Sequence, residues 1–589
     1  MRRVLTGTSA ARGMALGRAR LVQPSQISID HRPLPDGEVE VEVERLHSAM
    51  QAARDELREL RGKLQDTLPR EVGEFIDAHA LLLNDEELQH GLDRLIRERN
   101  LRASAALKAE GDRLGEVFEA MDDPYLRSRR EDVDQVISRV LAALHRQTSR
   151  EERKIASRSG QILVADTIAP ADMAHYSGHG LLGVIGVAGS TYSHSAILAR
   201  SLNLPMLVGT TEALSSISDE DLVLLDGENG EVVVHPTAQD LARYRAWQKE
   251  AAREGRRLAA LATAPTRTVD EVDIRLFANA ELPADVAQAR ALGASGVGLY
   301  RTEFLFLRRK TLPDEDEQFA AYRDLVLGMG GLPVTIRTLD LGADKADSAG
   351  LSLRGEDNPA LGVRGVRLSL RYPAVFATQM RAILRAAAYG PVRILVPMIT
   401  QAEEMQAVRT LMELCARELA HDGHETVDGL ELGAMIEVPA AAISVHAILE
   451  AADFLAIGTN DLAQYVLAAD RNNDALGTLY DPLQPALLRL IGHVIHASHR
   501  AGKPVSLCGE IAGDEAFTAL LMALGLTDFS MHPGQLLRVR DRISGLDRKR
   551  LLSLRSSLMR AHTREQVEAL LDGLAEPKRL AEPCPDTLD

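Results

Sequence analysis

Apolar residues recur every three or four positions through most of residues 40–148, with charged residues between them. A single apolar stripe at this spacing is typical of an amphipathic helix. The clearest stripe consists of Val43, Leu46, Met50, Ala53, Leu57, Leu60 and Leu64. Similar stripes predict helices over 72–82, 104–121 and 132–146, and Asp85 is placed to cap a helix start. Short connections between such helices predict a bundle. The bundle is either a spacer or a docking surface for a partner, and composition alone favours the spacer.

Residues 160–235 have a different pattern, in which short apolar runs alternate with loops. The runs 162–164, 183–187, 206–208, 222–225 and 232–234 predict strands, and 14–21 could supply another. We therefore predict a small α/β domain formed by 1–25 and 150–236, with the helical block 35–148 inserted into it. The charged stretch 239–261 predicts a linker helix within 237–263.

Eight strand-like runs alternate with helical patterns from residue 274 onwards. They are 274–277, 296–300, 334–337, 392–396, 433–436, 454–457, 505–507 and 528–530. Eight strands alternating with helices over roughly 290 residues predict a TIM (β/α)8 barrel. We assign 264–575 to this barrel and 576–589 to a tail, so the predicted fold class is multidomain α/β.

Polar side chains gather where the predicted barrel strands end, which is where such barrels carry their chemistry. The strand-end positions are Asn279, Arg301, Arg337, Met398, Glu437, Asn460 with Asp461, Cys508 and Met531. Guanidinium groups match the geometry of phosphate and carboxylate. Each arginine could instead pair with a local carboxylate, for example Arg301 with Glu303. Two arginines at strand ends, with Arg471 close behind, favour an anionic substrate.

Two further strand-end groups suggest chemistry. Glu437 and Asp461 offer the hard oxygen ligands that Mg²⁺ prefers, although the residues alone fit charge partners for the arginines equally well. Cys508 follows a strand near these cations, so we expect an accessible thiol with a lowered pKa that can act as acid or base. The alternative for Cys508 is a small buried hydrophobic residue.

His194 lies where a loop of small residues, 189–193, runs into a helical pattern. Free N–H groups and the helix macrodipole favour an anion at such a position. They also disfavour the imidazolium cation, so the neutral ring is available as a nucleophile. A phosphorylated imidazole would be a favoured anion there. The alternative is a histidine that only caps the helix.

Charge and composition narrow the class of protein. Among 589 residues, 85 are acidic and 68 basic, for a net charge of −17, which disfavours binding to nucleic acid or to an anionic membrane. No apolar run approaches the ~20 residues of a membrane span. Cys415, Cys508 and Cys584 are too few for a disulfide framework. We therefore expect a soluble, multidomain protein of a reducing compartment.

Several motifs resemble a known family over nearly the whole chain. They are SHSAILARSLNLPMLVGT (193–210), GVGLYRTEFLF (296–306), TIRTLDLGADK (335–345), NPALGVRGVRL (358–368), LGAMIEVPAA (432–441), IGTNDLAQYVLAADR (457–471) and LCGEIAGD (507–514). The sequence resembles enzyme I of the phosphoenolpyruvate-dependent sugar phosphotransferase system.

The resemblance implies a role for each matching position. His194 would accept the phosphoryl group of phosphoenolpyruvate, and Cys508 would protonate the enolate as pyruvate forms. Glu437 and Asp461 would bind Mg²⁺. The substrate contacts would be Arg301, Arg337, Asn460, Asp461 and Arg471, and Lys345 and Arg364 would lie near them.

The resemblance also implies partners and a division of labour. The small α/β domain would carry the phosphohistidine and swivel between the barrel and the inserted four-helix bundle. The bundle would bind the phosphocarrier protein HPr, and the barrel would form a homodimer. A paralogue serving a nitrogen-regulatory phosphorelay is the alternative within this class. A catalytically inactive scaffold that only binds a phosphocarrier is the alternative outside it, and the intact set of site residues argues against it.

Overall fold

The computed structural model describes most of the chain. The described residues are 2–22, 32–35, 37–63, 79–80, 82–83, 85–119, 133, 136–141, 143–144, 160–166, 168, 173, 176, 180–188, 194–202, 204–306, 311–342, 358–470 and 481–572. The chain divides into two compact units, Met1–Ala251 and Ala252–Asp589, which are described in turn.

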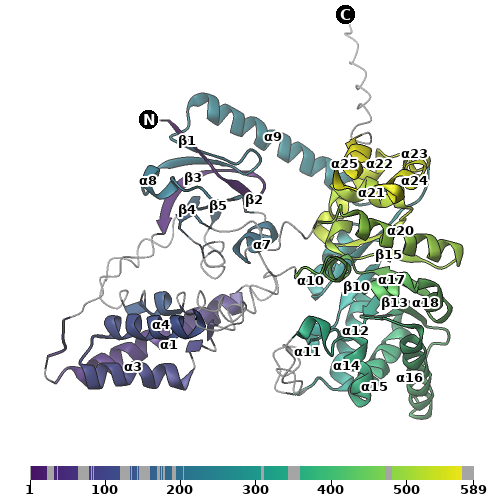
Figure 1. Cartoon of the computed structure of the whole chain (residues 1–589), viewed down its shortest axis with the longest axis horizontal. Helices are drawn as coiled ribbons and strands as arrows, with labels where there is room; N and C mark the ends of the chain where they lie inside the picture. Colours follow the sequence, from purple (N-terminus) through teal and green to yellow (C-terminus); the bar gives the residue numbers. More distant parts are fainter. Residues whose placement is uncertain are drawn as a thin grey trace, which may run out of the picture. The chain divides into compact units, whose positions relative to one another are not determined.

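An eight-stranded sheet organises the first unit (Figure 1). Its strands are β1 (Arg3–Thr6), β2 (Thr8–Ala11), β3 (Met14–Val22), β4 (Gln161–Ala165), β5 (Leu181–Gly186), β6 (Met206–Val208), β7 (Leu222–Asp226) and β8 (Glu231–Val234). They lie in the order β1-β8-β7-β3-β4-β5-β6-β2, with β3 to β6 parallel and the other pairs antiparallel. All six predicted runs are strands. The sequence pattern missed β1 and β2, which are short and lie at the two edges.

The segment between β3 and β4 contains three described helices: α1 (Val39–Lys63), α3 (Glu86–Arg99) and α4 (Ala103–Glu119). These helices pack against one another (Figure 1). Residues 136–141 are also helical. Leu46, Met50, Ala53 and Leu57 of the predicted stripe are fully buried. Asp85 accepts a hydrogen bond from Leu88 N at 3.0 Å and confirms the predicted cap of α3. Most of the predicted helix 72–82 lies outside the described residues, as do the side chains of Leu60 and Leu64.

The predicted linker helix is α9 (Ala238–Ala260). Its start has a capping arrangement, because Asp240 Oδ2 accepts from Thr237 N at 2.8 Å and from Thr237 Oγ1 at 2.7 Å. Arg2 adds a two-pronged ion pair to the same carboxylate. The remaining helices of the first unit are α7 (His194–Ser201) and α8 (Ala213–Ser216).

The second unit is a closed barrel of eight parallel strands. The strands are β9 (Arg275–Ala280), β10 (Val297–Arg301), β11 (Val334–Arg337), β12 (Val392–Val396), β13 (Glu431–Ile436), β14 (Phe454–Ile457), β15 (Val505–Leu507) and β16 (Asp528–Met531). Each overlaps a predicted run, so the TIM barrel and the multidomain α/β class are confirmed. Parallel strands covered on both faces need uninterrupted apolar sequence, which explains why the runs were recognisable.

Helices surround this barrel in Figure 1, coloured from teal to yellow along the chain. They are α10 (Pro283–Ala291), α11 (Glu303–Phe306), α12 (Glu315–Gly328), α14 (Val366–Arg371), α15 (Pro373–Ala386), α16 (Ala402–His421), α17 (Pro439–Ile443), α18 (Val445–Ala451), α19 (Thr459–Leu467), α20 (Pro485–Arg500), α21 (Glu515–Leu524), α22 (Leu536–Ser544), α23 (Arg548–Ser553), α24 (Arg555–Arg560) and α25 (Arg564–Asp572). Short 3₁₀ turns cover Pro359–Leu361, Ala387–Tyr389, Glu510–Ala512 and Pro533–Gln535. No helix in the described ranges is long and apolar enough to cross a lipid bilayer.

Candidate functional site

The carboxyl ends of the barrel strands bring the predicted polar residues to one face. Arg301 ends β10 and Arg337 ends β11. Glu437 follows β13, and Asp461 lies in the first turn of α19, directly after β14. Cys508 follows β15. Because all strands of the barrel run the same way, these residues share its carboxyl-terminal mouth.

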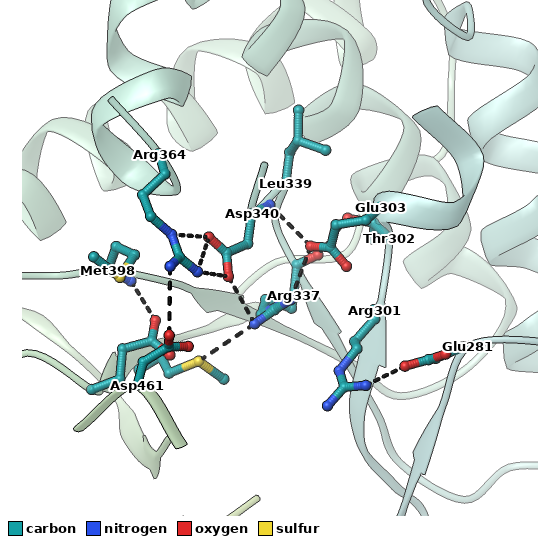
Figure 2. A network of polar contacts seen from close by, with 12 residues as sticks. Glu281, Arg301, Thr302, Glu303, Arg337, Leu339, Asp340, Arg364, Met398 and Asp461 are labelled. Carbon is teal, nitrogen blue, oxygen red and sulfur yellow. Dashed lines mark hydrogen bonds and ion pairs between the residues drawn. The ribbon is translucent and has the colours of Figure 1, made fainter. Parts of the chain in front are cut away.

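Arg337 is held between two carboxylates (Figure 2). Its Nη2 donates to Glu303 Oε1 at 3.0 Å, and its Nη1 lies 3.1 Å from Asp340 Oδ2. Burial disfavours the guanidinium cation, but Glu303 and Asp340 outweigh that effect and raise the pKa of Arg337. The side chain is therefore a fixed cation at the base of the mouth.

Arg301 does not pair with Glu303, the local carboxylate that the sequence offered as the alternative to an anionic substrate. Arg301 pairs instead with Glu281, which follows β9. Glu303 begins α11, and its carboxylate reaches across to the end of β11, where it also accepts Asp340 N at 2.9 Å. Sequence proximity suggested the nearest carboxylate, whereas the adjacent strand supplies the actual partner.

Asp340 joins a second arginine to this network. Arg364 Nη2 lies 3.0 Å from Asp340 Oδ2, and Arg364 Nη1 lies 3.5 Å from Asp461 Oδ1. Asp340 and Asp461 raise the pKa of Arg364 against the opposing effect of burial. Asp340 and Glu281 were not among the residues predicted from the sequence. Their signal was available, since each lies within three residues of a strand end.

Glu437 and Asp461 place two carboxylates at the same mouth. Glu437 is 1% exposed, and its Oε1 accepts Met398 N at 2.7 Å. Burial and the negative charges of Asp461 and Asp340 raise the pKa of Glu437 to about 8. Such a pair fits a divalent cation, which would favour the ionised form of both groups. Within the described ranges, no three His, Cys, Asp or Glu side chains form a metal cluster. A metal here would need other ligands, such as water or substrate.

Two glycines allow the loops at this edge to approach one another. A Cβ on Gly458 would lie 2.7 Å from Glu437 Oε2, and one on Gly509 would lie 1.7 Å from Thr459 Oγ1. Asn460 Nδ2 donates to Glu510 Oε1 at 3.0 Å, and Glu510 N donates back to Asn460 Oδ1 at 3.1 Å. These contacts fix the start of α19, and with it Asp461.

Several polar atoms buried at or beside this mouth have no hydrogen-bond partner among the described residues. They are Arg337 Nε, Glu303 Oε2, Thr338 Oγ1 and Thr459 Oγ1. Buried polar groups are normally paired, and exceptions need an explanation. A polar ligand at the mouth would supply the missing hydrogen-bond partner, most directly for the donor Arg337 Nε.

The prediction that Cys508 is accessible with a lowered pKa is wrong. The side chain is 4% exposed and packs with Leu299, Leu395, Met435, Phe454 and Ala456. Burial, with a smaller contribution from Glu437, raises the pKa of the Cys508 thiol to about 12, although Arg337 and Arg301 oppose the shift. The sequence showed the nearby cations but not that the side chain points into the barrel. A thiol in this setting keeps its proton at neutral pH, as a proton donor must.

His194 is the first residue of α7, as predicted. Its side chain lies outside the described part of the chain, as do Arg471, Lys345 and residues 189–193. The next residue anchors the helix start, because Ser195 Oγ donates to Ile168 O at 2.5 Å. The roles of His194, Arg471 and Lys345 therefore stay predictions.

Three family models match the chain in order. The N-terminal domain of phosphoenolpyruvate-utilising enzymes matches residues 6–129, their mobile domain matches 157–230, and their phosphoenolpyruvate-binding domain matches 255–548. The third match contains the whole barrel mouth, and the second contains His194.

Curated relatives are similar over nearly the whole chain. A phosphoenolpyruvate-protein phosphotransferase of Cupriavidus necator is 44% identical, across 97% of this chain and 99% of that protein. Proteins of the same name from Listeria monocytogenes and Staphylococcus aureus are 38% and 36% identical, with the same coverage.

Proposed function

The chain belongs to the phosphoenolpyruvate-protein phosphotransferase family, the enzyme I proteins, and from that premise we propose the following reaction. The phosphoryl group of phosphoenolpyruvate moves to the imidazole of His194 and then to the phosphocarrier protein HPr, and pyruvate is released. The observation that carries the proposal is the barrel mouth. Fixed cations and buried carboxylates meet there, and Arg337 Nε has no partner among the described residues.

Phosphoryl transfer depends mainly on positioning and on neutralising charge. Arg337 is held by Glu303 and Asp340, so it can contact an anionic substrate without first being ordered. Arg301 and Arg364 add guanidinium groups on either side. We assign Asn460 and Arg471 to the same substrate from their place in the family motifs, and Lys345 to its vicinity.

The transfer breaks the bond between phosphorus and the enol oxygen and forms a bond between phosphorus and a ring nitrogen of His194. The enolate that leaves needs one proton on carbon. Cys508 can donate it, since burial keeps the thiol protonated. The thiolate is then reprotonated, and pyruvate leaves.

Glu437 and Asp461 would hold Mg²⁺, with substrate oxygens completing its coordination. When bound, the ion would neutralise charge on the phosphate and carboxylate of the substrate. In its absence, burial and the neighbouring charges of Asp461 and Asp340 disfavour ionisation of Glu437, which raises the pKa of Glu437.

The proposal extends to partners and location. HPr would dock on the helical region that includes α1, α3 and α4, and the barrel would form a homodimer in the cytoplasm. The mobile domain would carry His194 between the two sites. The proposed domain limits are those predicted from the sequence: 1–25 with 150–236, 35–148, 237–263, 264–575 and the tail 576–589.

A phosphorylation assay tests the reaction. The protein incubated with labelled phosphoenolpyruvate and Mg²⁺ should acquire an acid-labile, base-stable phosphate, and adding HPr should remove it. His194→Ala should acquire none. Label that persists in His194→Ala would refute the assignment of the nucleophile, and absence of label in the unaltered protein would refute the function.

A further inference from the structure

A buried polar chain behind the barrel mouth has no part in the reaction described so far. It begins at Gln379 of α15, which is 1% exposed, and continues through Tyr322 and Gln318 of α12, which are equally buried. The hydrogen bonds of these three side chains are all made within the protein. These polar groups occupy core positions at which apolar side chains would also pack, so their hydrogen bonds need an explanation.

The hydrogen bonds of this buried polar series all run in one direction, from donor to acceptor. Gln379 Oε1 accepts Leu339 N at 2.9 Å, and Gln379 Nε2 donates to Tyr322 OH at 3.1 Å. Tyr322 OH donates to Gln318 Oε1 at 3.2 Å, and Gln318 Nε2 donates to Pro313 O at 3.1 Å. In each of these bonds an N–H or O–H group donates and an oxygen accepts. Buried networks in which every group is paired are rigid.

Gln379 also reaches the neighbouring strand end. Its Nε2 donates to Thr302 Oγ1 at 3.2 Å, and Thr302 Oγ1 donates to Arg337 O at 2.9 Å. Thr302 follows Arg301 directly, and Leu339 lies two residues after Arg337. One amide group therefore contacts the backbone segments that carry both strand-end arginines.

The loop after β11 depends on this contact. Its three successive N–H groups are each held by a different partner. Thr338 N donates to Leu395 O at 2.9 Å, Leu339 N to Gln379, and Asp340 N to Glu303. Asp340 in turn pairs with Arg337 and Arg364. Figure 2 shows Thr302, Leu339 and Asp340 around Arg337. Without Gln379, the middle N–H of this loop would be buried and unpaired.

We propose that Gln379 is a positioning residue for the phosphoenolpyruvate site. It sets the ends of β10 and β11 and thereby orients Arg301, Arg337 and Asp340. The inference rests on the proposed function. It adds a determinant of substrate affinity that lies behind the site and makes no contact with the ligand.

Gln379→Met tests the inference, since methionine has nearly the same shape but can neither accept from Leu339 N nor donate to Thr302. The KM for phosphoenolpyruvate should rise at least about tenfold, because a misplacement of about 1 Å can cost about 10²-fold. Transfer of phosphate from phosphorylated HPr to His194 needs no barrel site, so it should stay within about twofold of the unaltered protein and would show that the variant is folded.

Tyr322→Phe is the matched control. It breaks the next link of the chain in the same core but leaves the contacts of Gln379 with Leu339 and Thr302 in place. If Gln379 positions the site, the KM for phosphoenolpyruvate changes by less than about threefold in Tyr322→Phe, even where its loss of Tm equals that of Gln379→Met. Equal changes of KM in the two variants would mean that both act only through stability, and this would overturn the inference.

Gln379→Glu supplies a second readout. In its protonated form the carboxyl group offers one acceptor for Leu339 N and one donor for Thr302, so it replaces these two contacts of the amide but not the donation to Tyr322. When it ionises, the donor is lost. The KM for phosphoenolpyruvate should therefore be near normal at low pH and rise with pH in this variant, relative to the unaltered protein.

The outcomes separate the two proposals. If the unaltered protein takes no phosphate from phosphoenolpyruvate, the proposed function fails. If the unaltered protein is phosphorylated and Gln379→Met has an unchanged KM, only the role of Gln379 fails.

Discussion

Two sets of arginine–carboxylate ion pairs in this protein differ in their exposure to solvent. At the barrel mouth, Arg337 lies between Glu303 and Asp340 and is nearly inaccessible to solvent. On the helices of the first unit, Arg97 of α3 makes an equally short two-pronged pair with Glu40 of α1, but both groups are largely exposed. The distances are alike, whereas the surroundings differ.

The surroundings decide what each pair does. Removing one partner of a buried pair leaves an uncompensated charge, which is strongly unfavourable. An exposed pair exchanges its partner for water at little cost and is screened by salt. The buried network is therefore expected to serve binding and geometry, and the exposed pair to contribute little.

Arg337→Met should show the largest effect. It removes a fixed cation from the proposed substrate site, so kcat/KM with phosphoenolpyruvate should fall by about 10²–10³-fold or more. It also leaves Glu303 buried without its cation, while Asp340 keeps its pair with Arg364, and the unfolding free energy should fall by about 3–5 kcal/mol. Steady-state kinetics and denaturant unfolding measure the two losses. Arg97→Met is the control, and comparable losses there would break the comparison.

Cys508→Ala should be nearly as severe for turnover but mild for folding. Loss of a general acid typically costs about 10²–10⁴-fold, whereas a small apolar residue suits the cluster around Cys508. Exchange of phosphate between HPr and His194 should persist. Full turnover of Cys508→Ala with phosphoenolpyruvate would identify another donor, such as Glu510 or water.

The raised pKa of Cys508 predicts its reactivity. The folded value lies above that of an exposed thiol, so the proton is retained as pH rises through 8 and 9 and the thiolate stays scarce. Alkylation of Cys508 at pH 8 should therefore be far slower in the folded protein than after unfolding. Measurement by mass spectrometry decides this, and rapid labelling of the folded protein would contradict the burial of the thiol.

Asp340→Asn should have an intermediate effect. The amide keeps the shape of the side chain but removes the charge that holds Arg337 and Arg364 together. Glu303 still pairs with Arg337, so the arginine is not left alone. We expect about a tenfold rise in the KM for phosphoenolpyruvate, since each charge-assisted contact is worth about 1.5–3 kcal/mol. An unchanged KM would show that Glu303 alone suffices.

Arg97→Met should have the smallest effect on stability, and the direction in which this effect changes with pH can be stated. The hydrogen bond from Arg97 lowers the pKa of Glu40. Any stabilisation is thus present above the ordinary glutamate pKa and is lost as pH falls through the lowered value. Denaturation curves of the protein and of Arg97→Met should differ little at neutral pH, and added salt should remove the difference. A large, salt-insensitive loss would mean that the exposed pair behaves like the buried network.

Most of the fold could be predicted from the sequence, because strands and helix caps depend on residues close together in the chain. Barrel strands are covered on both faces, so most of them are rich in apolar residues, and all eight predicted runs overlap strands in the structure. Edge strands carry no such signal, and the four-residue β1 and β2 were missed. The cap at Asp85 was predictable because it depends on residues three apart.

Most of the strand-end residues at the mouth could also be named from the sequence, because strand ends follow directly from strand positions, but Glu281 and Asp340 were missed. What the sequence could not determine is which side chains face one another. Glu303 is two residues from Arg301 yet pairs with Arg337, thirty-four residues away. Cys508 was expected to lie beside the strand-end arginines, but apolar side chains surround it in the barrel. Gln379 looks like any helix residue until α15 packs behind two strand ends. Periodicity records which face a residue belongs to, whereas pairing, burial and pKa depend on neighbours that only the closed barrel brings together.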